Sequence, residues 1–446
     1  MKVLRKLPLS AALALALAAP AQAQSLVELF ESARSYDAAY QAAKAQYAAN
    51  KSKADQALAL VLPTVGLTAS SARAQVDFRA DVEAPGSEYK RWFGTHNATV
   101  TASQPLFRPG NLIAYDQSKK QLSLAVTQLI SAEHDLLIRV SQAYFDVLAS
   151  QDSLEFVRAQ KTAVSEQLAS AKRNFEVGTA TITDTREAEA RFDLVIAQEI
   201  AAENDLRVKK LALDQWVGIQ NAKPRPLKQG VELKSVMPQD PEVWVSDAEK
   251  FHPVIQSARL GLEIAALEIK RSKTSHMPTV DLQGSYGGVR NMSGTALTST
   301  GSHVVNSSVS VVMNLPLFSG FATDNRIKET VSLEEKARND LEAARRNVSQ
   351  ATRSAYFGVV SGVGQVKALQ AAEASSQLAL DANKLGYNVG VRINIDVLNS
   401  QSQLFQTKRD LAKARYDVLV GGLKLKQANG TLKAEDLQGI NALLSP

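Results

Sequence analysis

FEVGTATITD, the stretch from Phe175 to Asp184, returns as YNVGVRINID from Tyr387 to Asp396. The offset of 212 residues also carries Tyr144-Phe145 onto Tyr356-Phe357. Self-similarity over such a span indicates two tandem copies of one large structural unit. Further pairs at or near this offset are Leu211 with Leu423, Gly218 with Gly430, and Pro105-Leu106-Phe107 with Pro316-Leu317-Phe318.

The first 23 residues have the pattern of a secretory signal peptide. Three basic residues precede an apolar run over 7–19, and Ala21-Gln22-Ala23 forms an A-x-A cleavage site. We therefore expect the mature chain to start at Gln24. No later segment approaches 18 uncharged apolar residues, so we expect no transmembrane helix, and any membrane crossing would be made by strands.

Composition excludes several classes of protein. Removing the three basic residues of the signal leaves 48 Lys and Arg against 45 Asp and Glu, which is too balanced for a nucleic-acid-binding protein. The absence of cysteine excludes disulfides, thiolate metal sites and a lipid-modified N-terminal cysteine. No nucleotide-binding or hydrolase motif is present, and the five histidines are scattered. We expect no enzyme activity, no cofactor and no metal site.

Proline placement indicates two long helical regions, because there is no proline between Pro109 and Pro224 or between Pro316 and Pro446. The first region has apolar residues at alternating steps of three and four, typical of packed helices. We expect a helix over 112–177, which at 1.5 Å per residue is roughly 100 Å long. The positions that carry the rhythm are Leu122, Val126, Leu129, Leu136, Val140, Ala143 and Val147.

Each long helix is expected to end in a hairpin tip. Gly178 can take the left-handed conformation that terminates a helix, and a new helix is expected near Asp184, with Glu187 in capping-box spacing. The second copy has its break at Gly390 and its restart near Asp396.

Short segments of alternating polarity precede each long helix and predict strands. They cover 63–75 and 95–107 in the first copy and 278–290 and 304–318 in the second, with polar loops over 76–94 and 291–303. Strands of about ten residues can cross a bilayer when tilted. Four strands are too few to close a membrane barrel, so we expect the chain to oligomerise.

The expected layout has five parts. They are a signal peptide (1–23), repeat 1 (24–218, with helices over 112–177 and 184–218), an irregular proline-containing linker (219–250), repeat 2 (251–430, with helices over 322–387 and 396–429) and a C-terminal segment (431–446).

With these motifs in place, the chain resembles the TolC family of outer-membrane efflux and secretion channels over essentially its whole mature length. The resemblance rests on FEVGTATITD with its partner GYNVGVRINIDVLN (386–399), the paired LPTV (62–65) and MPTV (277–280), the two AYF and two PLF segments, and ANGTL (428–432). It implies a mixed α and β fold in which three copies form one 12-stranded β-barrel, with four strands per chain, continued by an α-helical barrel through the periplasm. The linker and the C-terminal segment would form an equatorial collar.

The resemblance also implies roles at the tips. Asp396 and Asn399 fall on the ring that narrows the periplasmic end, and Asn399 replaces a second aspartate, so a weaker affinity for cations is expected. Polar links that hold the tips closed fall on Asp184 with Arg392, and on Thr183 with Tyr387. Simpler interpretations stay open: both aspartates can be helix caps, Arg392 a solvated surface residue, and Tyr387 a packing residue.

The same resemblance places adaptor docking at the tips. Gly178 and Gly390 are in any case expected to terminate helices. Thr179 stands where an apolar residue is typical, which bears on the identity of the adaptor. The candidate docking residues are Val177, Gly178, Thr179, Val389, Gly390 and Val391.

The predicted function is a passive outer-membrane exit duct for drugs or secreted proteins, reaching from the outer membrane of a Gram-negative bacterium into the periplasm. Its implied partners are two further copies, a periplasmic adaptor and an inner-membrane transporter of the resistance-nodulation-division, major-facilitator or ABC type. The alternative is a barrel-anchored coiled-coil stalk with a role in attachment. The symmetric hairpin tips argue against that alternative.

Overall fold

The computed structural model describes residues 23–79, 81, 88–228, 230–231 and 236–445. The expected signal peptide lies outside these residues, apart from Ala23. The chain divides into two compact units. The helical unit contains the N-terminal residues up to Lys44 together with Gln128–Gln256 and Ala344–Pro446, and the strand unit contains Ala45–Thr127 and Ser257–Ala343.

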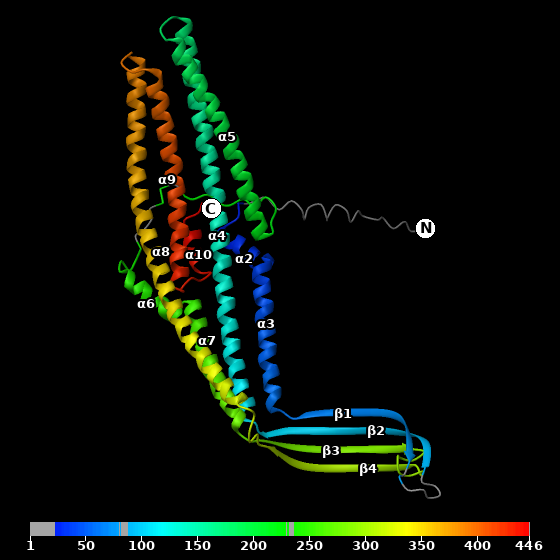
Figure 1. The fold of residues 1–446 in the computed structure, drawn as a ribbon. Coiled ribbons are helices and arrows are strands. Elements are labelled where there is room, and N and C mark those ends of the chain that lie inside the picture. The colour runs from blue at the N-terminus through cyan, green and yellow to red at the C-terminus, as the bar shows by residue number, and fades with distance from the viewer. Residues whose placement is uncertain (1–22, 80, 82–87, 229, 232–235, 446) are drawn as a thin grey trace, which may run out of the picture. The chain divides into compact units, whose positions relative to one another are not determined.

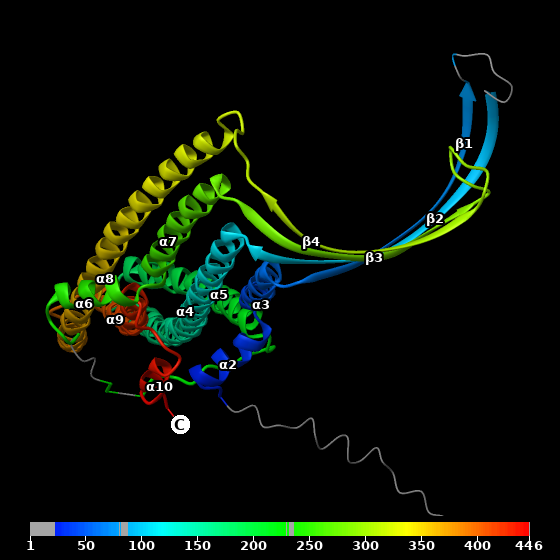
Figure 2. The same ribbon diagram turned by 90° about the horizontal axis from the view of Figure 1, so that it is seen from below.

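The strand unit contains an antiparallel sheet with the order β1-β2-β3-β4. The sheet curves along its length (Figure 2). Within the described chain β1 pairs only with β2, and β4 pairs only with β3, so both outer strands keep one free edge. The four strands are β1 (Thr64–Arg79), β2 (Glu88–Phe107), β3 (Thr279–Met292) and β4 (Ser302–Asn314).

The strands extend further into the expected polar loops than the sequence indicated, whereas β4 ends at Asn314, before the expected boundary at 318. β1 has 16 residues and β2 has 20, and their register continues without a break from Thr64 opposite Ser103 to Arg79 opposite Glu88. Side-chain pairs stabilise this extension: the Phe78 and Tyr89 rings stack with centroids 5.2 Å apart. Loop-like composition misled the prediction because backbone pairing tolerates polar side chains on an exposed face. The loop expected over 76–94 is therefore partly strand.

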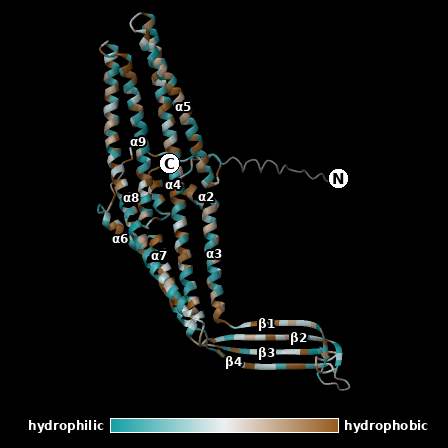
Figure 3. Ribbon diagram, in the orientation of Figure 1, coloured by the Kyte–Doolittle hydropathy of each residue, from teal (hydrophilic) through white to brown (hydrophobic). Residues whose placement is uncertain are grey.

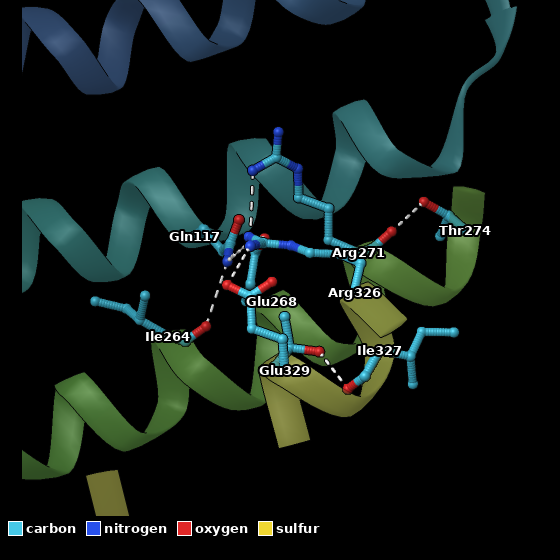
Figure 4. Close-up of polar contacts among 9 residues, drawn as sticks. Gln117, Ile264, Glu268, Arg271, Thr274, Arg326, Ile327 and Glu329 are labelled. Carbon is cyan, nitrogen blue, oxygen red and sulfur yellow. Dashed lines mark hydrogen bonds and ion pairs between the residues drawn. The ribbon is translucent and has the colours of Figure 1, made fainter. Parts of the chain in front are cut away.

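A polar network joins three helices of the strand unit (Figure 4). These are α4 (Pro109–Glu176), α7 (Pro253–Lys273) and α8 (Ala322–Asn388). Glu268 on α7 accepts a hydrogen bond from Gln117 Nε2 of α4 at 2.9 Å and one from Arg326 Nη2 of α8 at 2.9 Å. Arg271 lies 3.4 Å from the same carboxylate. One carboxylate with three donors fixes the rotation of these helices about their axes, because each donor comes from a defined face.

The helices lie within a few residues of the ranges expected from the sequence, because the glycine and proline signals that bound them are local. The four repeat helices are α4 (Pro109–Glu176), α5 (Ile182–Val217), α8 (Ala322–Asn388) and α9 (Asn394–Ala428). The remaining helical segments are α2 (Leu26–Tyr36), α3 (Ala38–Leu58), η2 (Ala59–Val61), α6 (Pro241–Phe251), η3 (Thr274–His276) and α10 (Asp436–Asn441).

The linker is less irregular than expected, since α6 forms inside it. Asp240 caps this helix by accepting a hydrogen bond from the Glu242 amide at 2.9 Å, and Pro241 occupies the first helical position. Proline is well suited to that position, where no amide donor is needed. The proline density that predicted a linker thus marks a helix start at this point.

The main core of the helical unit lies where α2, α4, α5, α9 and α10 meet, and is built around Phe30, Tyr144, Phe145 and Leu213. The repeated tyrosines both bind the linker backbone: Tyr144 donates to the carbonyl of Arg225 at 3.0 Å, and Tyr356 donates to that of Gln239. The ring of each tyrosine also meets the ring of the following phenylalanine edge to face, with the centroids 5.4 Å apart. The apolar rhythm of α4 is buried from Leu136 onward.

Hydrophobic and hydrophilic residues interleave along the helices (Figure 3). Among the described residues, no helix combines the length and the apolar character needed to cross a membrane.

Candidate functional site

The two hairpin tips of the helical unit end their long helices in the same way. Gly178 has a φ of 79° and Gly390 a φ of 78°, the left-handed conformation that glycine adopts without strain. The amide after each glycine, of Thr179 or Val391, bonds back five residues at 2.8 Å in both tips. The glycine amides bond back three residues, at 3.0 and 3.1 Å. This is the Schellman motif in both copies.

The restart of the helix differs between the copies. In repeat 1 the cap is Thr181, whose Oγ1 accepts from the Asp184 amide at 3.2 Å, while the Asp184 carboxylate accepts from the Thr181 amide at 2.9 Å. The helix cap is thus three residues earlier than the expected Asp184, which is the third helical residue of a capping box rather than its cap. Thr181 caps the helix because its hydroxyl oxygen can accept a hydrogen bond and because Asp184 lies three residues after it.

In repeat 2 the corresponding cap position is Ile393, which makes no side-chain cap. Its side chain cannot accept a hydrogen bond and is 61% exposed. Asp396, for which a cap role was considered, is the third residue of α9, and its carboxylate lies 3.6 Å from the guanidinium of Arg392. The second tip therefore lacks the local closure of the first.

Asn394 connects the second tip to the first. It is the first residue of α9 and is 0% exposed. Its Nδ2 donates to the carbonyl of Asp184 on α5 at 3.2 Å, and its Oδ1 accepts from Gln167 Nε2 of α4 at 2.5 Å. A buried amide with both ends satisfied stabilises one arrangement of the two hairpins, since separation would leave polar groups unpaired.

A second link joins the tips nearer their ends. Asn174 Nδ2 donates to the Tyr387 hydroxyl at 3.1 Å, so the oxygen that distinguishes Tyr387 from Phe175 is used. Arg392 folds against Gly386, where an added Cβ would lie 2.7 Å from Arg392 Cγ. Asp184 and Arg392 make no direct contact within the described chain, because each has a local partner.

Asn399 lies on α9 one turn beyond Asp396, and its side chain contacts α5. Arg191 Nη2 donates to Asn399 Oδ1 at 2.8 Å. Thr183 lies in the first turn of α5 beside Asp184. Within the described chain it makes no hydrogen bond with Tyr387, its expected partner, whose hydroxyl is bound by Asn174 instead.

The tip loops expose apolar side chains. Val177 is 74% exposed, Val389 65% and Val391 78%. These valines flank the terminating glycines, and a Cβ added to either glycine would meet nothing within 4 Å. Exposed apolar groups gathered at such ends are typical of interaction surfaces.

Sequence reasoning missed Gln167, Asn174, Arg191 and Asn394 as members of this site. Asn394 carried a signal, because a polar residue stands there at the position where the first repeat has the apolar Ile182. The other three carried none, since polar residues on long helices are ordinarily solvated.

The fold defines a class of protein. The model of the outer membrane efflux protein family matches residues 29–219 and 244–431, which are the two repeats, and the chain belongs to this family. Its members are channels of the Gram-negative outer membrane rather than enzymes. The protein is accordingly an outer-membrane efflux channel.

Individual relatives agree with this assignment. The chain is 31% identical to the outer membrane protein TolC of Vibrio cholerae, over 99% of this chain and 98% of that one. It is 28% identical to the alkaline protease secretion protein AprF of Pseudomonas aeruginosa, over 94% and 87% of the two chains. The fold matches the crystal structure of the outer membrane protein VceC of Vibrio cholerae, with a TM-score of 0.76 at 19% identity over 91% and 96%.

These comparisons confirm the family and the outer-membrane location predicted from the sequence. TolC-family channels work with adaptor proteins and inner-membrane transporters, and a trimer is typical of them. The alternative of an attachment stalk receives no support.

Proposed function

We propose that three copies of this chain form one exit duct, with their sheets joined into a 12-stranded barrel and their helices forming a periplasmic tunnel. The observation that carries this proposal is the pair of free edges on β1 and β4. An unpaired edge in lipid costs several kcal/mol per backbone group, so β4 of one copy would pair with β1 of the next. The expected signal peptide, cleaved after Ala23, would export the chain.

The gate of this duct lies at the helical tips. Opening separates the second hairpin from the first, which breaks the bonds of Asn394 and the bond between Asn174 and Tyr387. Asp184 and Arg392 form a further latch. Within one chain Asp184 accepts from Thr181 and Arg392 faces Asp396. The latch therefore joins Asp184 of one copy to Arg392 of a neighbouring copy. Thr183 forms the second latch with Tyr387 of a neighbouring copy, because within its own chain the Tyr387 hydroxyl is bound by Asn174.

Asp396 and Asn399 form the narrowest ring. One carboxylate per chain, already facing Arg392, gives this ring a modest negative charge. We expect divalent cations to bind there more weakly than they would to a ring with two aspartates per chain.

The tip loops dock the adaptor through Val177, Gly178, Thr179, Val389, Gly390 and Val391. Their exposed valines supply apolar contact area, and binding there offsets the loss of the links between the hairpins. An inner-membrane transporter of the resistance-nodulation-division, major-facilitator or ABC type supplies the energy. The cargo is a drug or a secreted protein, and the likeness to AprF favours testing secretion as well as efflux.

The test is the single-channel conductance of the purified mature protein in a planar bilayer. We expect small discrete steps from the wild type and larger steps from Arg392→Ala and Asp184→Ala. Thr181→Ala is the matched control for Asp184→Ala, because it breaks the same capping box but keeps the carboxylate. Equal conductance in the wild type and both latch variants would contradict the latch. A bilayer without channels, formed with folded trimers, would contradict the duct.

A further inference from the structure

A polar cleft of about 380 Å³ lies between α4, α5 and α9 in the helical unit. The charged residues that line it are Arg191 and Arg409, and no lining residue is acidic. The other lining residues are glutamines, an asparagine, a serine, a leucine and valine. A cleft with this composition presents positive charge to whatever enters it.

Both guanidinium groups bind neutral oxygens. Arg191 donates to Asn399 Oδ1 at 2.8 Å, and Arg409 donates to Gln160 Oε1 at 3.1 Å and to Gln406 Oε1 at 2.7 Å. Within the part of the chain that the structure describes, neither guanidinium has a carboxylate within 4.0 Å. Two arginines near the tips differ, because Arg186 pairs with Glu189 at 2.7 Å and Arg392 with Asp396 at 3.6 Å.

The two positive charges are incompletely compensated. Burial lowers the pKa of Arg409, and the neighbouring Asp410 opposes that change. The Ser402 hydroxyl, which also lines the cleft, is buried without a hydrogen-bond partner in the described chain. A partly desolvated cation with a free hydroxyl nearby favours an anionic ligand, because an anion restores the interactions lost from water.

We propose that this arginine cleft is a binding site for small inorganic anions and that Arg191 sets the ion selectivity of the tip. The selectivity part rests on the proposed function, which puts Asn399 in the narrowest ring. A guanidinium bonded directly to Asn399 adds one positive charge per chain beside the ring, where the one carboxylate, that of Asp396, already faces Arg392. The mouth then passes chloride more readily than a ring of carboxylates alone would.

The experiment measures the reversal potential of single channels in a potassium chloride gradient. Arg191→Gln is expected to raise the cation-to-anion permeability ratio at least about twofold, because the ring loses positive charge. Arg191→Lys should keep the wild-type ratio, since it keeps the charge. Asn399→Asp is an independent variant that should shift the ratio in the same direction as Arg191→Gln.

Arg186→Gln is the matched control. It removes one positive charge from the same helix, at an arginine that is already paired with Glu189 and does not line the cleft. Discrete channels whose permeability ratio is the same in Arg191→Gln as in Arg186→Gln would overturn this inference and leave the duct intact. Absence of channels from folded wild-type trimers would instead overturn the proposed function.

Discussion

The two hairpin tips end alike and begin again differently. Both close their long helices with a left-handed glycine and the same pair of backbone hydrogen bonds. The first tip then caps its next helix with Thr181 and Asp184, whereas the second has Ile393 at the cap and sends Asn394 across to the first tip. The first tip is thus stabilised by its own cap residues, whereas the second is stabilised by hydrogen bonds to the first. We therefore expect the second tip to be the one that moves.

Removing the Asn394 side chain, which connects the two tips, should produce the largest change in their stability. Asn394→Ala would leave Gln167 Nε2 and the Asp184 carbonyl without their buried partner, which costs about 2 kcal/mol. We expect faster hydrogen exchange in both tips, with the greater change in the second, together with larger conductance steps.

The matched control is Asn388→Ala, because Asn388 is an exposed asparagine at the end of α8. It should leave the exchange of both tips near the wild-type rate. If the exchange rates of the two variants agree, Asn394 does not hold the tips together.

Acid should destabilise the helical unit at a place separate from the tips. Burial lowers the pKa of His252 to about 4, and repulsion from His134 adds to this shift. The pKa in the folded state is below the unfolded value of 6.5, so the stability contribution is complete above that pH and is lost as pH falls toward 4. The free energy of unfolding falls by about 1.5 kcal/mol over this range, after allowance for solvent screening.

Thermal melting of the trimer at pH 7.5 and pH 5 measures this loss. His252→Gln should reduce the difference between the two melting temperatures. Burial also lowers the pKa of His134, and the Leu432 backbone, Glu133 and Asp135 oppose that change. An unchanged difference in the variant would assign the acid sensitivity to other groups.

Exchanging the caps should produce the smallest and most specific effect. Thr181→Ala removes the cap of the first tip and should destabilise its helix start by about 1 kcal/mol. Ile393→Thr supplies the missing acceptor with Asp396 already at the third position, and should stabilise the second start by about 0.5 to 1 kcal/mol. Hydrogen exchange of the first turns of α5 and α9 reports both changes. Shifts of the same sign in the two variants would contradict the cap assignment.

Sequence reasoning reached the repeats, the long helices, the tip glycines and the family, because these depend on local signals that recur at a fixed offset. It placed the start of α5 late, since Asp184 and Glu187 imitate the spacing of a capping box that Thr181 and Asp184 form. It shortened β1 and β2 because polar residues such as Asp77 and Arg91 resemble a loop until their backbone pairing is known. The contacts of Asn394 and Arg191 depend on helices far apart in sequence, which periodicity does not bring together.

Gly386 and Arg392 show how the duplicated copies diverged as pairs of residues. The first copy has Asn174 and Ala180 at these two positions, and the second cannot accept a Cβ at 386 while the arginine side chain lies against it. The two differences are therefore epistatic: asparagine at 386 alone is unfavourable, and it is less so once 392 is alanine, because the 2.7 Å contact with Cγ is then gone and the contact with Cβ at 3.3 Å remains. Anyone transplanting one tip onto the other scaffold must move both positions together.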